Sequence, residues 1–195
     1  MSWSTNIAAV PNPQTDKRSR LIQTAMLLSY QQGFRKTTLA DIAERAGVPL
    51  GNVYYYFKTK DEIAHAIIER RLSQFYALRE TFESLASPKD RLLAFAQMTM
   101  NHREQLAKGG CEMGTLCSEL QKEPGELAIK AGRLLSEPLA WLAAQFEALG
   151  KAPAEGLALH LLSALQGVSV LANALHDPAV VAAETAYLKA WIEEL

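Results

Sequence analysis

The chain has 195 residues, of which 49% are hydrophobic and 21% are charged, a balance that excludes disordered and collagen-like proteins. Its apolar residues form no run of roughly 18, and the first fifteen residues lack the basic start and apolar core of a secretory signal. We therefore expect a cytoplasmic protein that makes no membrane contact. Its two cysteines are too few for a disulfide framework and stand beside no zinc-type cluster, so we expect no metal and no cofactor.

The net charge of −1 is unevenly distributed along the chain. Residues 1–60 carry eight basic and three acidic side chains, a net charge of +5, whereas the remainder carries a net charge of −6. A basic N-terminal region followed by an acidic remainder indicates that the N-terminal region contacts a polyanion. The remainder should then serve another purpose.

The periodicity of apolar residues predicts helices and no strands. Residues 1–15 contain two prolines and no sustained period, and we expect a flexible arm there. From residue 16 onward, apolar residues recur at spacings of three and four, and capping residues, glycines and prolines punctuate the pattern. About nine helices are predicted, over approximately 16–33, 38–46, 50–56, 59–85, 88–108, 113–122, 127–149, 153–176 and 179–193. The predicted fold class is all-α.

The segment 33–60 reads GFRKTTLADIAERAGVPLGNVYYYFKTK. Two short amphipathic helices in it are joined at Ala46, Gly47 and Val48, where glycine accepts a positive φ at little cost. This is the pattern of a helix-turn-helix, in which the second helix lies in the major groove of DNA.

The segment also carries Gly-Phe, two Thr, Asp-Ile-Ala, Ala-Gly-Val, Gly-x-x-Tyr-x-Tyr-Phe and Lys in order. This pattern resembles the DNA-binding domain of TetR/AcrR-type transcriptional repressors over about residues 16–62. The resemblance implies a three-helix DNA-binding domain over 16–61 and a larger helical bundle over 62–195 for ligand binding and dimerisation. Pro49 stands where many members have Ser or Thr, and Tyr55 stands where His is frequent; neither change removes a feature that docking requires.

Eight residues of this segment are predicted to contact DNA. Lys58 and Lys60 can neutralise phosphates, and Asn52 can pair with adenine. A tyrosine-rich short helix is in general more often packing than DNA contact, but the resemblance favours contact for two of the tyrosines. The predicted contacts are Thr38, Leu50, Gly51, Asn52, Tyr54, Tyr55, Lys58 and Lys60.

The C-terminal helices are predicted to form a homodimer interface. Residues 157–175 are apolar nearly all round, so this helix must be buried on more than one face. In the family that the chain resembles, the last two helices form a four-helix dimer interface; the alternative is that they only close a monomer's core. The predicted interface residues are Leu161, Ala164, Gly167, Val168, Leu171, Leu188 and Trp191.

A set of soft and aromatic side chains is predicted to line a pocket for a small apolar or aromatic effector. Each of them could equally be a core residue. The set comprises Phe75, Phe95, Met98, His102, Met113, Leu116, Trp141, Phe146 and His160.

Cys111 and Cys117 could form a thiol sensor. Gly109 and Gly110 end one helix directly before Cys111, which places this thiol near the start of the next. Free N–H groups there stabilise a thiolate, whereas the neighbouring Glu112 opposes one. The Gly-Cys-x-x-Gly-x-Leu element resembles one in a branch of TetR-like repressors, some of which respond to electrophiles or drugs. The alternative is that both cysteines are structural and have no sensing role.

These features predict a homodimeric repressor that binds a palindromic operator in double-stranded DNA and releases it when a small molecule binds. One alternative is a thiol-based electrophile or redox sensor. Another is a constitutive architectural DNA-binding protein without an effector, and a third is a helical adaptor that has lost DNA binding. No nucleophile–base spacing, phosphate loop or metal motif favours an enzyme.

Overall fold

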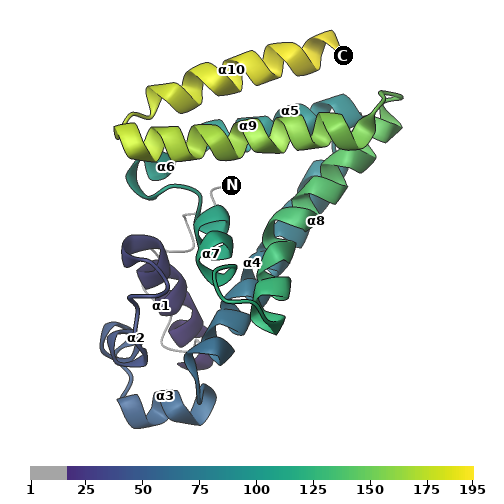
Figure 1. Ribbon diagram of the computed structural model, residues 1–195. Coiled ribbons are helices and arrows are strands. Elements are labelled where there is room, and N and C mark those ends of the chain that lie inside the picture. Colours follow the sequence, from purple (N-terminus) through teal and green to yellow (C-terminus); the bar gives the residue numbers. More distant parts are fainter. Residues whose placement is uncertain (1–16) are drawn as a thin grey trace. The chain divides into compact units, whose positions relative to one another are not determined.

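The computed structural model describes residues 17–195, and within them all regular secondary structure is helical (Figure 1). The all-α fold class predicted from the sequence is confirmed. The predicted arm over 1–15 lies outside the described residues. The helices are α1 (Lys17–Gln32), α2 (Leu39–Ala46), α3 (Leu50–Tyr56), α4 (Lys60–Glu83), α5 (Pro88–Asn101), α6 (Arg103–Gly109), α7 (Glu112–Leu120), α8 (Glu126–Ala148), α9 (Ala154–Leu175) and α10 (Ala179–Glu194).

The described chain forms two compact units. The head unit comprises residues 17–72 and 115–134, and the body unit comprises residues 73–114 and 135–195. Three helices, α4, α7 and α8, contribute residues to both units. The segment 115–134 therefore packs with the helix-turn-helix, although it follows that motif by more than fifty residues.

Local signals define the helices of the head unit. Thr38 and Asp41 form the predicted capping box at the start of α2, with the two hydrogen bonds running in opposite directions. Gly47 ends α2 in the left-handed region, at φ 63°. α3 follows Pro49, which makes no side-chain cap, and buries Val53 against the core together with Phe57. Local interactions therefore define the start of α2 and the turn that ends it.

The structure divides the predicted helix over 88–108 into α5 and α6, so the described chain has ten helices. The break lies at His102, whose backbone N–H donates to the Thr99 carbonyl at 3.1 Å rather than to the Met98 carbonyl. The His102 ring instead places Nδ1 2.7 Å from that Met98 carbonyl oxygen. A side chain thus takes the acceptor that an uninterrupted α-helix would give to the backbone.

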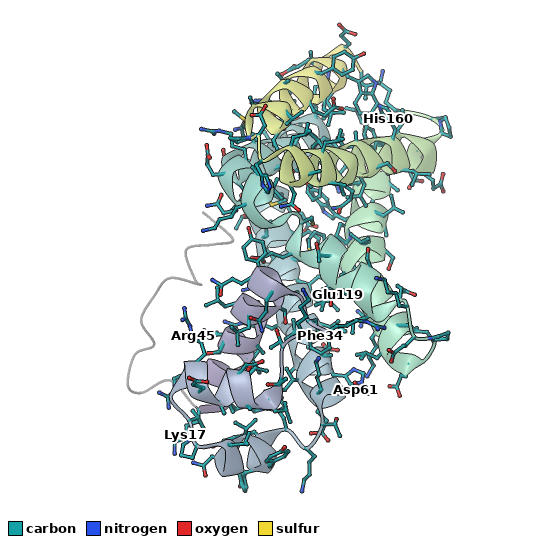
Figure 2. All side chains as sticks on the ribbon, turned by 60° about the vertical axis from the view of Figure 1, so that its left-hand side comes forward. Lys17, Phe34, Arg45, Asp61, Glu119 and His160 are labelled. Atoms are coloured by element: carbon teal, nitrogen blue, oxygen red, sulfur yellow. The ribbon has the colours of Figure 1, made fainter. Side chains whose placement is uncertain are left out.

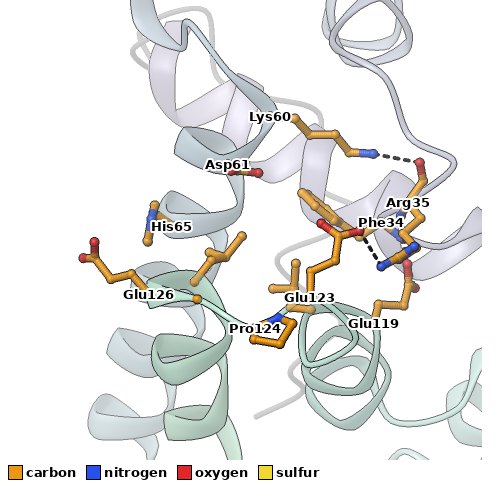
Figure 3. A pocket seen from close by; sticks show the side chains of 12 residues that line it. Phe34, Arg35, Lys60, Asp61, His65, Glu119, Glu123, Pro124 and Glu126 are labelled. Atoms are coloured by element: carbon orange, nitrogen blue, oxygen red, sulfur yellow. Dashed lines mark hydrogen bonds and ion pairs between the residues drawn. The ribbon is translucent and has the colours of Figure 1, made fainter.

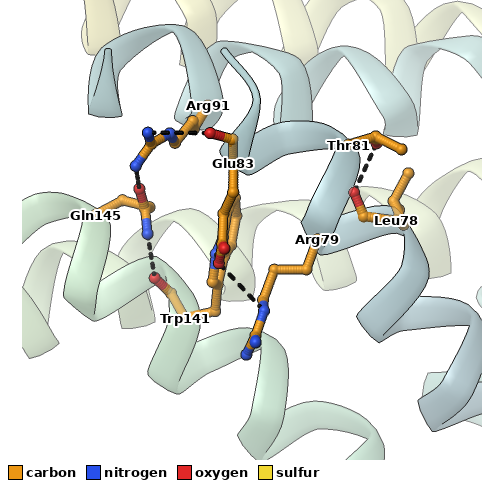
Figure 4. Close-up of polar contacts among 7 residues, drawn as sticks. All are labelled: Leu78, Arg79, Thr81, Glu83, Arg91, Trp141 and Gln145. Carbon is orange, nitrogen blue, oxygen red and sulfur yellow. Dashed lines mark hydrogen bonds and ion pairs between the residues drawn. The ribbon is translucent and has the colours of Figure 1, made fainter. Parts of the chain in front are cut away.

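The body unit is built on α5, α6, α9 and α10, which pack against one another. Three rings, those of Phe82, Phe95 and Trp141, pack with centroids 5.6–6.2 Å apart. The Trp141 indole N–H donates to the Glu83 carboxylate at 3.3 Å (Figure 4). Arg91 donates to the Glu83 backbone carbonyl and to Gln145, which ties the end of α4 to α5 and α8.

Among the described helices, α9 is long and apolar enough by length and composition to cross a membrane, which the sequence analysis did not anticipate. It packs against α6 and α10, and 39% of its most apolar window is buried. A core helix of a globular protein has the same composition.

Candidate DNA interface and associated sites

The solvent-facing surface of α3 carries five of the eight residues predicted to meet DNA. Tyr55 is 80% exposed, Tyr54 is 49% exposed and Leu50 is 40% exposed. Gly51 and Asn52 are also exposed. The Tyr55 ring packs edge-on against that of Tyr56, at a centroid distance of 5.0 Å. A group of exposed large apolar and aromatic side chains is typical of an interaction surface.

Gly51 presents backbone to solvent at the start of α3. A Cβ atom added there would meet no atom within 4 Å, and its φ is not positive. Neither strain nor packing within the chain therefore requires glycine at this position. Close approach of another molecule to the helix would require it.

Thr38 is exposed at the N-terminus of α2. Two hydrogen bonds from Thr38 hold the pKa of Asp41 below the ordinary value; the larger effect comes from the backbone N–H and the smaller from the side chain. Asp41 therefore stays ionised at neutral pH and keeps Thr38 in the capping conformation, with its hydroxyl at the positive end of the helix.

Lys58 and Lys60, which the sequence predicts as equivalent phosphate contacts, have different environments. Lys58 is exposed, and its backbone N–H donates to the Glu62 carboxylate at 2.8 Å. Lys60 is half-buried: its Nζ donates to the Arg35 carbonyl at 2.7 Å and lies 4.7 Å from the centre of the Phe34 ring (Figure 3). Burial lowers the pKa of Lys60. Lys60 therefore already has partners inside the head unit, whereas Lys58 presents its side chain to solvent.

A cleft of about 580 Å³ lies beside Lys60 in the head unit (Figure 3). Carboxylates outnumber cationic groups on its walls, and no sequence motif marks it. The residues from α7 and α8 that line it have no spacing that relates them to residues 33–35, so sequence reasoning missed them. The lining comprises Phe34, Arg35, Lys60, Asp61, His65, Glu119, Leu120, Glu123, Pro124, Gly125, Glu126 and Leu127.

The predicted effector-pocket residues divide between core and surface. In the body unit, Phe75, Phe95, Trp141 and Phe146 are buried, and so is His102, which contacts the Met98 carbonyl. Met98 and Met113 are half-buried. His160 is exposed, with its ring 5.0 Å from that of Trp191. Leu116 is buried and belongs to the head unit.

The two cysteines are free thiols in different settings. Cys111 directly precedes α7 and is half-buried; its sulfur accepts the Gly114 backbone N–H at 3.4 Å and the Gln166 side-chain amide at 3.5 Å. A Cβ at Gly114 would lie 2.5 Å from the Gln166 Oε1, so glycine makes room for this amide. Cys117 is buried, and burial raises the pKa of its thiol.

The structure corrects part of the predicted dimer interface. Leu161, Val168 and Leu188 are buried in the body unit's own core, so they have no surface to offer to a second copy. Gly167 and Leu171 are exposed on α9, and Ala164 and Trp191 are half-buried. Further apolar side chains that the sequence analysis did not select share the exposed face of α9: Leu159, Val170 and Leu175, which are 56%, 68% and 62% exposed.

Residues 21–67 match the family model described as bacterial regulatory proteins of the tetR family. The transcriptional repressor NemR of Escherichia coli is 32% identical over 115 residues, which cover 58% of this chain and 56% of NemR. The chain thus aligns with only about half the length of this relative. The transcriptional repressor ComR of the same organism is 28% identical over 171 residues, covering 83% of this chain and 81% of ComR.

Solved structures share the fold at low sequence identity. A TetR transcriptional regulator from Legionella pneumophila superposes with a TM-score of 0.82 at 18% identity, covering 94% of this chain and 98% of that one. The reduced form of E. coli NemR gives a TM-score of 0.77 at 22% identity, covering 89% of this chain and 96% of that one. The all-α arrangement of the described residues is therefore one that other proteins adopt.

Proposed function

Because residues 21–67 match the model of the tetR family of bacterial regulatory proteins, we propose that the chain is a member of this family, a homodimeric transcriptional repressor that binds a palindromic operator. The observation that carries the proposal is the exposed surface of α3, where Tyr54 and Tyr55 stand beside Gly51 and Asn52. These side chains can reach base edges and phosphates when α3 enters the major groove. The protein acts in the cytoplasm and needs no cofactor or catalytic activity for this role.

Dimerisation uses the exposed apolar face of α9. Small residues, Ser163, Gly167 and Ala174, lie on the same face as Val170 and let a second helix approach closely. Two heads related by a twofold axis then match the two halves of a palindrome.

The effector of this proposal is a small apolar or aromatic molecule that binds the body unit. It would enter among the aromatic side chains around Phe95 and Trp141, which are packed against Phe82 in the structure. Its binding would favour a state with lower operator affinity, and it can shift the equilibrium only by its differential affinity for the two states.

Selection of bound duplexes from a random DNA pool tests the proposal. We expect the purified protein to enrich one inverted repeat, and a footprint on that sequence to cover both half-sites. If the protein binds all duplexes with equal affinity, it is instead an architectural DNA-binding protein. If it binds no duplex, it is a helical adaptor that has lost DNA binding. Screening apolar and aromatic compounds for release of the selected duplex then separates an effector-controlled repressor from a constitutive one.

A second candidate function is thiol-based sensing at Cys111. It is favoured by the placement of Cys111, which is half-buried directly before α7 and whose sulfur accepts N–H groups from Gly114 and Gln166. A thiol so placed is open to alkylation or oxidation, and either change would displace the Gln166 amide from it.

We expect Cys111 to react with a mild alkylating agent roughly tenfold faster than Cys117, because Cys117 is buried and its raised pKa leaves little thiolate at neutral pH. Mass spectrometry of partially alkylated protein measures both rates. Alkylation should release the operator from the parent and not from Cys111→Ser. Equal labelling of the two thiols, or release that persists in Cys111→Ser, would make both cysteines structural and leave reversible ligand binding as the switch.

A further inference from the structure

The turn between α1 and α2 is held by a carboxylate from a distant part of the chain. Glu119 on α7 accepts the Phe34 N–H through Oε1 at 3.2 Å and the Arg35 N–H through Oε2 at 2.8 Å. Each carboxylate oxygen thus has its own backbone donor. Figure 2 labels Phe34 in this turn and Glu119 on α7. Hydrogen bonds to an ionised acceptor are stronger than those between neutral groups.

The local backbone of the turn suits an anion. Gly33 has a φ of 88°, and the two residues that follow it direct successive N–H groups at one carboxylate. Successive N–H groups next to a left-handed residue form a concavity that binds anions. A Cβ at Gly33 would lie 3.1 Å from the Glu119 Oε1, so glycine here serves both the turn and the close approach of the carboxylate.

The same turn leads directly into the helix-turn-helix. Thr37 donates its backbone N–H to the Phe34 carbonyl at 3.1 Å and its hydroxyl to the Gly33 carbonyl at 2.9 Å. The next residue, Thr38, caps α2. On the other side of the turn, the Arg35 carbonyl accepts the Lys60 ammonium from the start of α4. The turn that leads into α2 is therefore held from both α7 and α4.

We propose that Glu119 is a positioning residue for operator binding: its carboxylate fixes the α1–α2 turn and so orients α2 and α3 for the major groove. The inference rests on the proposed function and deepens it, because it names a residue outside the helix-turn-helix on which DNA affinity depends. It also gives α7 a direct connection to the DNA-binding helices, since any displacement of α7 moves the carboxylate that holds the turn.

Glu123, four residues further along the chain and just past the end of α7, provides a matched control. Its carboxylate forms an ion pair with the Arg35 guanidinium at 2.8 Å, but the two side chains are 81% and 50% exposed. Exposed ion pairs contribute little to folding stability. Glu119→Gln and Glu123→Gln remove the same charge from the same cleft. Charge removal alone would leave DNA affinity equal or slightly higher in both, because one repulsion with phosphates is lost.

The test measures operator affinity and hydrogen–deuterium exchange in the full-length parent, Glu119→Ala, Glu119→Gln and Glu123→Gln. We expect Glu119→Ala to weaken binding to the selected duplex about tenfold and to speed exchange in the segment 33–38 by a similar factor. Glu119→Gln should weaken binding in the same direction and by less, because its amide keeps one acceptor oxygen. Glu123→Gln should stay within about twofold of the parent in both measurements.

Circular dichroism at the assay temperature shows whether each variant is folded, and Glu119→Gln preserves the side-chain shape if Glu119→Ala does not fold. Parent-like operator affinity in the folded Glu119 variants, or parent-like exchange over 33–38, would overturn the inference. A parent that selects no DNA sequence would overturn the proposed function instead, and the exchange measurements would still decide whether Glu119 holds the turn.

Discussion

Replacing Val170 with aspartate is expected to convert the protein from a dimer into a monomer. Val170 is 68% exposed and lies on the apolar face of α9 that the proposed dimer buries, near Gly167 and Leu171. An unpaired carboxylate buried in such an interface costs about 3–5 kcal/mol, because no partner offsets its desolvation. Dimerisation should weaken by roughly two to nearly four orders of magnitude, since about 1.4 kcal/mol corresponds to a factor of ten. Light scattering coupled to size exclusion measures the mass directly.

Ile129→Asp is the matched control for this substitution. Ile129 is 76% exposed on α8, belongs to the head unit, and is likewise an apolar residue on a free helical surface. We expect Ile129→Asp to remain dimeric and to bind the operator. A parent that is monomeric at micromolar concentration, or a Val170→Asp variant with the mass of a dimer, would exclude α9 as the interface. Because one head contacts only one half-site, monomeric Val170→Asp should also lose most of its operator affinity.

Tyr54→Ala is expected to weaken operator binding by about ten- to hundredfold with no loss of folding stability. Tyr54 is 49% exposed on α3, so truncating it removes contact area with DNA while leaving the buried Val53 and Phe57 in place. A contact of this kind to a base or phosphate contributes about 1–3 kcal/mol. Fluorescence anisotropy with the selected duplex gives the change in affinity, and thermal unfolding followed by circular dichroism gives the stability.

Tyr54→Phe separates the two roles of this side chain. If the hydroxyl donates to a phosphate, the phenylalanine variant should lose nearly as much affinity as Tyr54→Ala. If the ring packs on a thymine methyl group, Tyr54→Phe should bind like the parent protein and lose affinity only for duplexes that lack this thymine. Parent-like affinity in Tyr54→Ala would mean that α3 does not enter the groove by this face, and the docking geometry would have to be abandoned.

Much of the fold was predictable because its determinants are local. The Thr38–Asp41 capping box, the left-handed Gly47 and the buried Val53 each follow from residues within a few positions of one another. The exposure of Leu50, Tyr54 and Tyr55 also agrees with the sequence, since a helix that buries one face must expose the other.

Predictions were less successful where they depended on which part of the chain packs against a given helix face. The composition of residues 157–175 indicates burial on more than one side, but it does not tell which residues the chain itself covers. The structure buries Leu161 and leaves Val170 open. Likewise, the His102 ring interrupts the predicted helix over 88–108 because its Nδ1 lies against the Met98 carbonyl, which a count of apolar spacings does not detect.

The sequence by itself determined most of the helices, the Thr38 cap and the face of α3 that is exposed, because these depend on backbone propensities and on a period of 3.6 residues. Only the tertiary structure decided that Glu119 holds the turn at Phe34 and Arg35, and that Lys60 is drawn to the Arg35 carbonyl while Lys58 stays exposed. The physical reason is that a hydrogen bond between residues 85 positions apart leaves no periodic mark in the sequence. Such a contact exists only once the packing of α7 with the head unit has brought a carboxylate to two free N–H groups.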